Sequence, residues 1–224
     1  MIEVLPSPIP INKSQLEDEI AKVSKFAHLV QVDISDGIFT TVKTWPYNGQ
    51  DRDYFEKLKT EIDGWPKWEE VDIELHLMIK NPENIVHDWI KTGITAAVAH
   101  VEATNDFQKF INICKENDVT VGIAIKPSTD ISKLEPFASQ VDFIQVMGSD
   151  ILGKHGVELD LKAIDMIAAL RKLYPERIIA IDIGVTEESA SVLVAAGANK
   201  LISGGEILNS DNPEEVFRYL ESIS

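Results

Sequence analysis

Short apolar runs alternate with amphipathic segments along the whole chain, and this alternation limits the possible folds more than any other feature of the sequence. Segments such as 14–26 and 161–173 have helical spacing. The runs rich in Val, Ile, Leu and Ala have the length of buried strands and cover residues 2–5, 29–34, 71–79, 96–101, 119–125, 141–147, 178–183 and 200–202. Strict alternation of eight strands with about eight helices predicts a parallel sheet closed into a (β/α)8 TIM barrel, with residues 1–224 as one domain.

A doubly wound open sheet is the competing architecture for such a pattern. That fold carries a G-x-G-x-x-G turn after its first strand when it binds a dinucleotide, and no such motif follows residues 2–5. The least regular stretch is 37–50, which follows the second strand and contains Trp45-Pro46-Tyr47. In a barrel, a loop after a strand lies on the catalytic face, so this stretch is a candidate lid that could also shape substrate choice.

The charge balance excludes several classes of partner. The chain has 37 Asp and Glu against 21 Lys and Arg, a net charge of -16. A surface of this sign repels nucleic acids and anionic lipids, although backbone N–H groups can still hold a small anion. Cys114 is the only cysteine, which fits a reducing compartment. Because the sequence also shows no signal-peptide pattern and no membrane-spanning apolar run, we expect a cytoplasmic protein.

Three polar residues occupy otherwise apolar strands close to their carboxyl ends: Asp33, His76 and Asp182. Such groups are costly to bury unless they are paired or bind a cation. One interpretation is a shared site, in which two carboxylates and an imidazole hold a divalent metal and the carboxylates move protons. The alternative is three separate, locally hydrogen-bonded residues. Their common position at one end of three strands favours the shared site.

Glycines follow the last strands of the predicted barrel. Ser203-Gly204-Gly205 follows the eighth strand, and Gly184 follows the seventh. Loops after strands seven and eight form the usual phosphate site of these barrels, because glycine allows the backbone N–H groups to approach the anion. The alternative is that these glycines serve only tight turns. We expect a phosphate site here.

Several motifs resemble those of ribulose-phosphate 3-epimerases, in order and at the expected spacing. They are Pro6-Ser7, 32–37 (VDISDG), 74–78 (ELHLM), 100–103 (HVEA), 122–129 (GIAIKPST), Val146-Met147, 181–185 (IDIGV) and 196–204. The resemblance implies a (β/α)8 barrel that binds a divalent metal, commonly zinc. It also implies inversion of one carbon of a ketopentose phosphate through an enediolate, D-ribulose 5-phosphate to D-xylulose 5-phosphate.

Position by position, the resemblance implies that Asp33 and Asp182 are the acid and base and also metal ligands, with His76 as a metal-binding histidine. Its implied substrate or phosphate contacts are Ser7, Met78, Met147, Gly184, Ser203, Gly204 and Gly205. The implied partner is a small phosphorylated sugar, and related barrels commonly form homo-oligomers.

The sequence departs from the family at several places, among them Ser35, where the family has a methionine, and Gly205, where a serine is usual. Gln31 stands where the family has a metal-binding histidine, Pro10 aligns with a serine, Ile183 replaces a glycine, and the loop at 148–156 has a different glycine pattern. We keep Gln31 as a candidate metal ligand. Its amide oxygen is a weaker zinc donor than imidazole, so the metal could be magnesium or manganese, or could be lost.

These departures leave three alternatives to the pentose-phosphate epimerase. One is a non-catalytic phosphosugar-binding barrel without the metal, and another is an epimerase of a different ketose phosphate. The third is a decarboxylase or hexulose-phosphate synthase of the same superfamily. The Asp-x-Lys-x-x-Asp motif of that third group is missing from strand three, which reads ELHLMIK at 74–80.

Overall fold

Each of the eight apolar runs forms a strand in the computed structural model, which describes residues 2–223. All neighbouring pairs are parallel, in the order β1-β8-β7-β6-β5-β4-β3-β2. The strands are β1 (Glu3–Pro6), β2 (Leu29–Ser35), β3 (Asp72–Met78), β4 (Ala96–His100), β5 (Thr120–Ile125), β6 (Phe143–Met147), β7 (Ile178–Asp182) and β8 (Lys200–Ser203).

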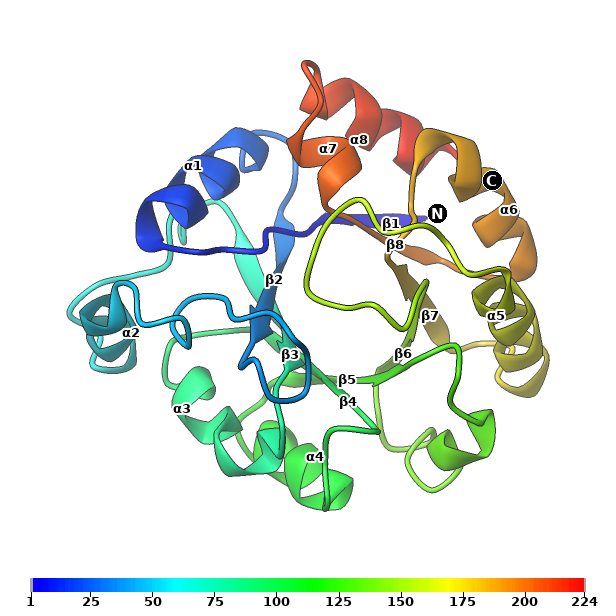
Figure 1. Ribbon diagram of the computed structural model, residues 1–224, viewed down its shortest axis with the longest axis horizontal. Helices are drawn as coiled ribbons and strands as arrows, with labels where there is room; N and C mark the ends of the chain where they lie inside the picture. The colour runs from blue at the N-terminus through cyan, green and yellow to red at the C-terminus, as the bar shows by residue number, and fades with distance from the viewer. Residues whose placement is uncertain (1, 224) are drawn as a thin grey trace.

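The two ends of this order meet, so the sheet closes on itself. The backbone N–H of Asp33 in β2 donates to the carbonyl of Pro8, just after β1, at 3.0 Å. Figure 1 shows the resulting ring of strands with the helices outside it. The prediction of a single (β/α)8 barrel is therefore confirmed.

Helices cover the outside of the barrel (Figure 1). Asn12 caps the first of them by accepting from the N–H of Gln15, and Thr186 caps α6 in a reciprocal capping box with Ser189. No helix within residues 2–223 is both long and apolar enough to cross a membrane. The helices are α1 (Lys13–Val23), α2 (Arg52–Lys59), η1 (Pro82–Asn84), α3 (Val86–Ile90), α4 (Phe107–Glu116), η2 (Ile131–Leu134), α5 (Leu161–Leu173), α6 (Glu187–Ala196), α7 (Gly205–Leu208) and α8 (Pro213–Ser222).

The core has two parts because each strand is buried on both faces. A large apolar layer lies between the barrel and the helices, and a smaller cluster fills the inside of the barrel around Met78, Phe143 and Met147. Burial on both faces explains why the strands read as nearly continuous apolar runs. It also makes every polar side chain that points inward conspicuous.

The stretch 37–50 divides its aromatic residues between two places. Trp45 is fully buried outside the barrel, packed among Tyr54, Trp65 and Trp89, and its indole N–H donates to the carbonyl of Asp51 at 3.0 Å. Phe39 instead lies over the barrel, with its ring 4.9 Å from that of His100. Trp45 therefore stabilises the packing of β2 against α2 and α3 and does not line the site described below.

Candidate active site

Asp33, His76 and Asp182 meet at the carboxyl end of the barrel. Asp33 in β2 lies directly beside His76 in β3, and Asp182 is the last residue of β7. His76 Nδ1 is 3.0 Å from Asp33 Oδ1 and 3.4 Å from Asp182 Oδ2. One ligand atom from each residue lies within 4.8 Å of the other two, and all three side chains are buried. The predicted convergence of the three residues is therefore observed.

The two carboxylates create a strongly negative position around His76 Nδ1. Burial alone would lower the pKa of His76, but Asp33 and Asp182 outweigh it and raise that pKa to about 10. Burial, together with the nearby charge of Asp182, raises the pKa of Asp33 above its usual range despite the opposing effect of His76. A raised carboxyl pKa suits a group that must both carry and release a proton near neutral pH.

A second hydrogen-bonded pair fixes the orientation of the His76 ring. Glu102 can only accept when ionised, so His100 Nδ1–H donates to Glu102 Oε2 at 3.2 Å. Burial lowers the pKa of His100 to about 4, so His100 is neutral at pH 7 and its Nε2 has a free lone pair. His76 Nε2–H therefore donates to His100 Nε2 at 2.9 Å, which leaves His76 Nδ1 facing the carboxylates.

These three side chains fit a divalent cation. Two carboxylates and one imidazole nitrogen are directed at a common point. Zinc sites use all three donors, and the carboxylates also suit manganese and magnesium. The donation from His76 Nε2–H to His100 resembles the outer contacts that orient metal-binding histidines. The geometry therefore supports a metal site at Asp33, His76 and Asp182 without identifying the ion.

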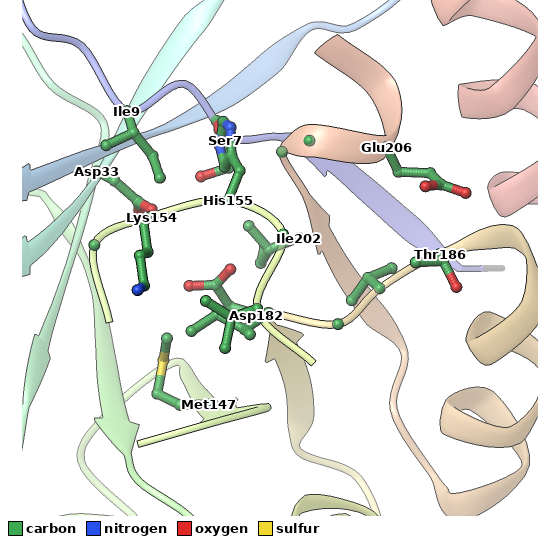
Figure 2. Close-up of a pocket in the computed structure, with 18 of the residues that line it drawn as sticks. Ser7, Ile9, Asp33, Met147, Lys154, His155, Asp182, Thr186, Ile202 and Glu206 are labelled. Carbon is green, nitrogen blue, oxygen red and sulfur yellow. The ribbon is translucent and has the colours of Figure 1, made fainter. Parts of the chain in front are cut away.

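A cavity of about 200 Å³ opens beside the three residues. Asp33 and Asp182 face into it, and Figure 2 shows Ser7, Lys154 and Met147 around the same space. This volume is below the roughly 300–1,000 Å³ of sites for drug-sized ligands, so it suits a small metabolite. Most of the predicted substrate contacts line it: Ser7, Met78, Met147, Gly184, Gly204 and Gly205.

Two glycines of the cavity wall, Gly184 and Gly204, are required by close approach or by backbone conformation. A Cβ on Gly204 would lie 2.7 Å from the carbonyl oxygen of Ser7 and would overlap the ring of His155. Gly184 has φ +73°, and its neighbour Ile183 has φ +77°, a conformation that a β-branched residue rarely adopts. The Oγ of Ser7 is buried and has no hydrogen-bond partner within residues 2–223. The cavity therefore offers both open backbone and a free hydroxyl.

Two predicted contacts lie outside the cavity. Ser203 is buried behind it, where its Oγ–H donates to the carbonyl of Val185 at 3.3 Å and ties the loop after β7 to β8. Gln31 is absent from the cavity lining, and its amide N–H groups donate to Glu74 at 2.6 Å and to Gln145 at 2.9 Å. Pro10 also lies away from the cavity, and its carbonyl accepts from the N–H of Trp45.

Sequence reasoning missed two polar residues of the cavity, Lys154 and His155, in the loop after β6. The side chain of Lys154 points into the cavity, and His155 lies beside Ser7 (Figure 2). His155 Nε2–H donates to the carbonyl of Ser7 at 3.0 Å. The sequence indicated these two residues only through the unusual glycine pattern of the loop at 148–156. The structure is needed to show that this loop turns back over the barrel.

The comparison with protein families decides where this chain belongs. The model of the ribulose-phosphate 3 epimerase family matches residues 3–208. The chain belongs to this family. The ribulose-phosphate 3-epimerase of Schizosaccharomyces pombe is 26% identical over 224 residues, covering 98% of this chain and 92% of that protein. The Bacillus subtilis ribulose-phosphate 3-epimerase is 25% identical over 224 residues, covering 97% of each.

Solved structures share the barrel of this epimerase-family chain. The 3-hexulose-6-phosphate synthase of Salmonella typhimurium superposes with a TM-score of 0.70 at 13% identity, covering 98% of this chain and 96% of that one. A variant of the tryptophan synthase alpha-subunit from Pyrococcus furiosus gives 0.68 at 15% identity, with 100% and 99% coverage. At such identities the likeness shows the fold alone.

Proposed function

We propose that this protein inverts the configuration at the carbon beside the carbonyl of a phosphorylated ketose, with D-ribulose 5-phosphate and D-xylulose 5-phosphate as the expected pair. One observation carries the proposal: the two buried carboxylates, Asp33 and Asp182, face one small cavity that also contains the glycine loops. Family membership supports the substrate class. We further propose that the protein acts in the cytoplasm, in keeping with its single buried thiol, Cys114.

The reaction needs one group to remove a proton from carbon and another to return a proton on the opposite face. In one direction Asp182 is the base and Asp33, whose pKa is raised by burial, is the acid; the roles exchange in the reverse direction. A divalent cation held by Asp33, His76 and Asp182 would stabilise the negative charge that develops on the ketose oxygens. The chain's own residues then supply proton transfer, orientation and exclusion of water.

The glycine loops are the proposed binding site for the substrate phosphate. Gly184, Gly204 and Gly205 line one side of the cavity, where small residues leave backbone N–H groups open to an anion. Lys154, from the loop after β6, adds a positive charge to a cavity whose other charged side chains include Asp33 and Asp182. A phosphate bound here would hold the sugar chain between the carboxylates.

Proton exchange with solvent is the direct test. The protein is incubated in heavy water with a panel of pentose and hexose ketose phosphates, and NMR follows deuterium at the carbon beside the carbonyl. We expect exchange and epimer formation with the wild type. Asp182→Asn should abolish both while phosphosugar binding is kept, and Asp165→Asn, at an exposed position of α5, should change neither.

The same experiment separates the alternatives. Exchange with a hexose phosphate alone would identify an epimerase of another ketose phosphate. Binding of phosphosugars by a protein that gives no exchange with any of them, at saturating zinc, manganese or magnesium, would refute the epimerase and indicate a non-catalytic binding barrel. Full exchange by Asp182→Asn would remove Asp182 from the mechanism.

A further inference from the structure

A chain of four buried polar side chains crosses the barrel beneath the candidate active site. Lys200 comes from β8, Glu74 from β3, Gln31 from β2 and Gln145 from β6, and none is more than 4% exposed. Lys200 Nζ is 2.6 Å from Glu74 Oε2, Gln31 Nε2 is 2.6 Å from Glu74 Oε1, and Gln31 Nε2 is 2.9 Å from Gln145 Oε1. These distances make one continuous hydrogen-bonded series.

The direction of every bond in this series is determined by its charged end. A lysine ammonium can only donate and an ionised carboxylate can only accept, so Glu74 must accept from both Lys200 and Gln31. Gln31 therefore directs its NH₂ group towards Glu74 and Gln145. Gln145 accepts from Gln31 through its carbonyl oxygen, and its own NH₂ group lies between Gln31 Oε1, at 3.5 Å, and the active site.

The NH₂ group of Gln145 ends among the reacting groups. Gln145 Nε2 lies 3.4 Å from Asp182 Oδ2 and 3.4 Å from His76 Nδ1. It is also 3.7 Å from the sulfur of Met147, which lines the cavity. A donor at this position holds one oxygen of Asp182 and leaves the other oxygen free.

We propose that Gln145 is a positioning residue that orients the Asp182 carboxylate for proton transfer, and that Lys200, Glu74 and Gln31 fix the direction of its amide. This inference rests on the proposed epimerase function and adds to it. The buried ion pair of Lys200 and Glu74 thus has a role in the reaction although it lies below the cavity. Without it, the Gln145 amide could turn by 180° and present its carbonyl oxygen to Asp182, which would repel the carboxylate.

Gln145→Met tests the proposal, because methionine fills a similar volume without an N–H group. Losing an outer contact of this kind typically costs 10–100-fold in activity or metal affinity. We expect kcat for ketose-phosphate epimerisation to fall about 10–100-fold, while KM changes less than about threefold, since the phosphate loops are untouched. Mn²⁺ affinity, measured calorimetrically, should weaken about 10–100-fold. The matched control is Gln108→Met on α4, which should leave all three quantities unchanged.

A double variant tests the contribution of Lys200 and Glu74, which do not contact Asp182 themselves. Lys200→Met combined with Glu74→Gln removes both buried charges and leaves a neutral amide next to Gln31, so the direction of the series is no longer imposed. We expect kcat to fall at least about threefold with KM retained, since even a partial turn of the Gln145 amide weakens the contact. Wild-type kcat in this double variant would overturn the role assigned to Lys200 and Glu74.

The outcomes distinguish this inference from the proposed function. If the wild type is active and binds Mn²⁺ but folded Gln145→Met keeps both properties, the positioning role of Gln145 is overturned and the epimerase stands. If the wild type neither exchanges solvent protons nor binds Mn²⁺, the proposed function fails. Crystal structures of wild type and Gln145→Met then decide the inference alone: a rotated Asp182 carboxylate supports it and an unchanged one refutes it.

Discussion

The buried ion pair of Lys200 and Glu74 should make the protein unusually sensitive to loss of one partner. Lys200 is 4% exposed and Glu74 is 1% exposed, and their charged groups are 2.6 Å apart. Within residues 2–223, the other lysine ion pairs as short as 3 Å lie outside the barrel. The aliphatic stem of Lys200 also carries its ammonium over the ring of Phe143, at 4.3 Å. In Lys200→Met the stem volume is kept and only the charge is lost.

The expected loss of stability in Lys200→Met follows from the contacts that Glu74 keeps. Glu74 would keep one neutral hydrogen bond, from Gln31, and no counter-charge. Breaking a buried pair by removing one partner typically costs about 3–5 kcal/mol, because the other charge stays desolvated. For a chain of this length, 1 kcal/mol corresponds to about 2–4 °C in Tm, so Lys200→Met should melt roughly 6–20 °C below the wild type.

Adding Glu74→Gln to Lys200→Met should restore part of this stability. The double variant leaves one neutral amide NH₂ group without an acceptor, at about 1–3 kcal/mol, in place of an uncompensated charge. Urea unfolding followed by circular dichroism and tryptophan fluorescence, with coincident transitions required, measures all variants. The exposed Lys133→Met should lie within about 0.5 kcal/mol of the wild type. A loss below 1 kcal/mol in Lys200→Met, or a double variant less stable than it, would refute this reasoning.

Four further predictions concern the cavity and its neighbours. Gly204→Val should weaken phosphosugar binding at least about tenfold in calorimetry, because its side chain would fill the cavity wall. Lys154→Ala should raise KM with little change in kcat, since its charge acts on the bound anion. In urea unfolding, Ile183→Gly should have a free energy of unfolding about 1–2 kcal/mol higher than that of Ile183→Ala, because alanine in this position keeps the strained φ of +77° and glycine tolerates it. In the folded protein the pKa of His100 is lowered to about 4 and that of Glu102 to about 2, so each group takes up its proton more readily in the unfolded chain. The free energy of unfolding should therefore fall as the pH drops from about 6.5 towards 2. His100→Gln should remove the part of this loss above pH 4.

The barrel could be predicted because its signal is local. Every strand is buried on both faces, so each produces an apolar run, and the runs agree with the observed strands to within one or two residues at nearly every end. The stretch 37–50 has no such periodicity. Its aromatic residues could equally cover the cavity or pack outside the barrel, and only the structure shows that Trp45 does the latter.

The three central residues of the site could also be predicted, by the cost of burying Asp33, His76 and Asp182 in apolar strands. The same cost applies to Gln145, in the middle of the apolar run 141–147, but a single strand does not show which partner satisfies it. Gln31 and Gln145 are 114 residues apart in the sequence, and Lys200 and Glu74 are 126 apart. Such contacts exist only after the barrel closes, so a pattern within one segment cannot reveal them.

The charges of the two buried groups explain why one is a candidate for ligand binding and the other is not. Lys200 and Glu74 balance each other, and the amides of Gln31 and Gln145 complete their hydrogen bonds, so this group needs no additional partner. In the group of three side chains that lie within 4.8 Å of one another, Asp33 and Asp182 share one imidazole, His76, which at most halves their negative charge. A buried group with uncompensated negative charge beside an open cavity attracts a cation, a proton or both. This difference in charge is why we place the proposed proton transfer in the upper layer of the barrel and assign the lower layer a positioning role.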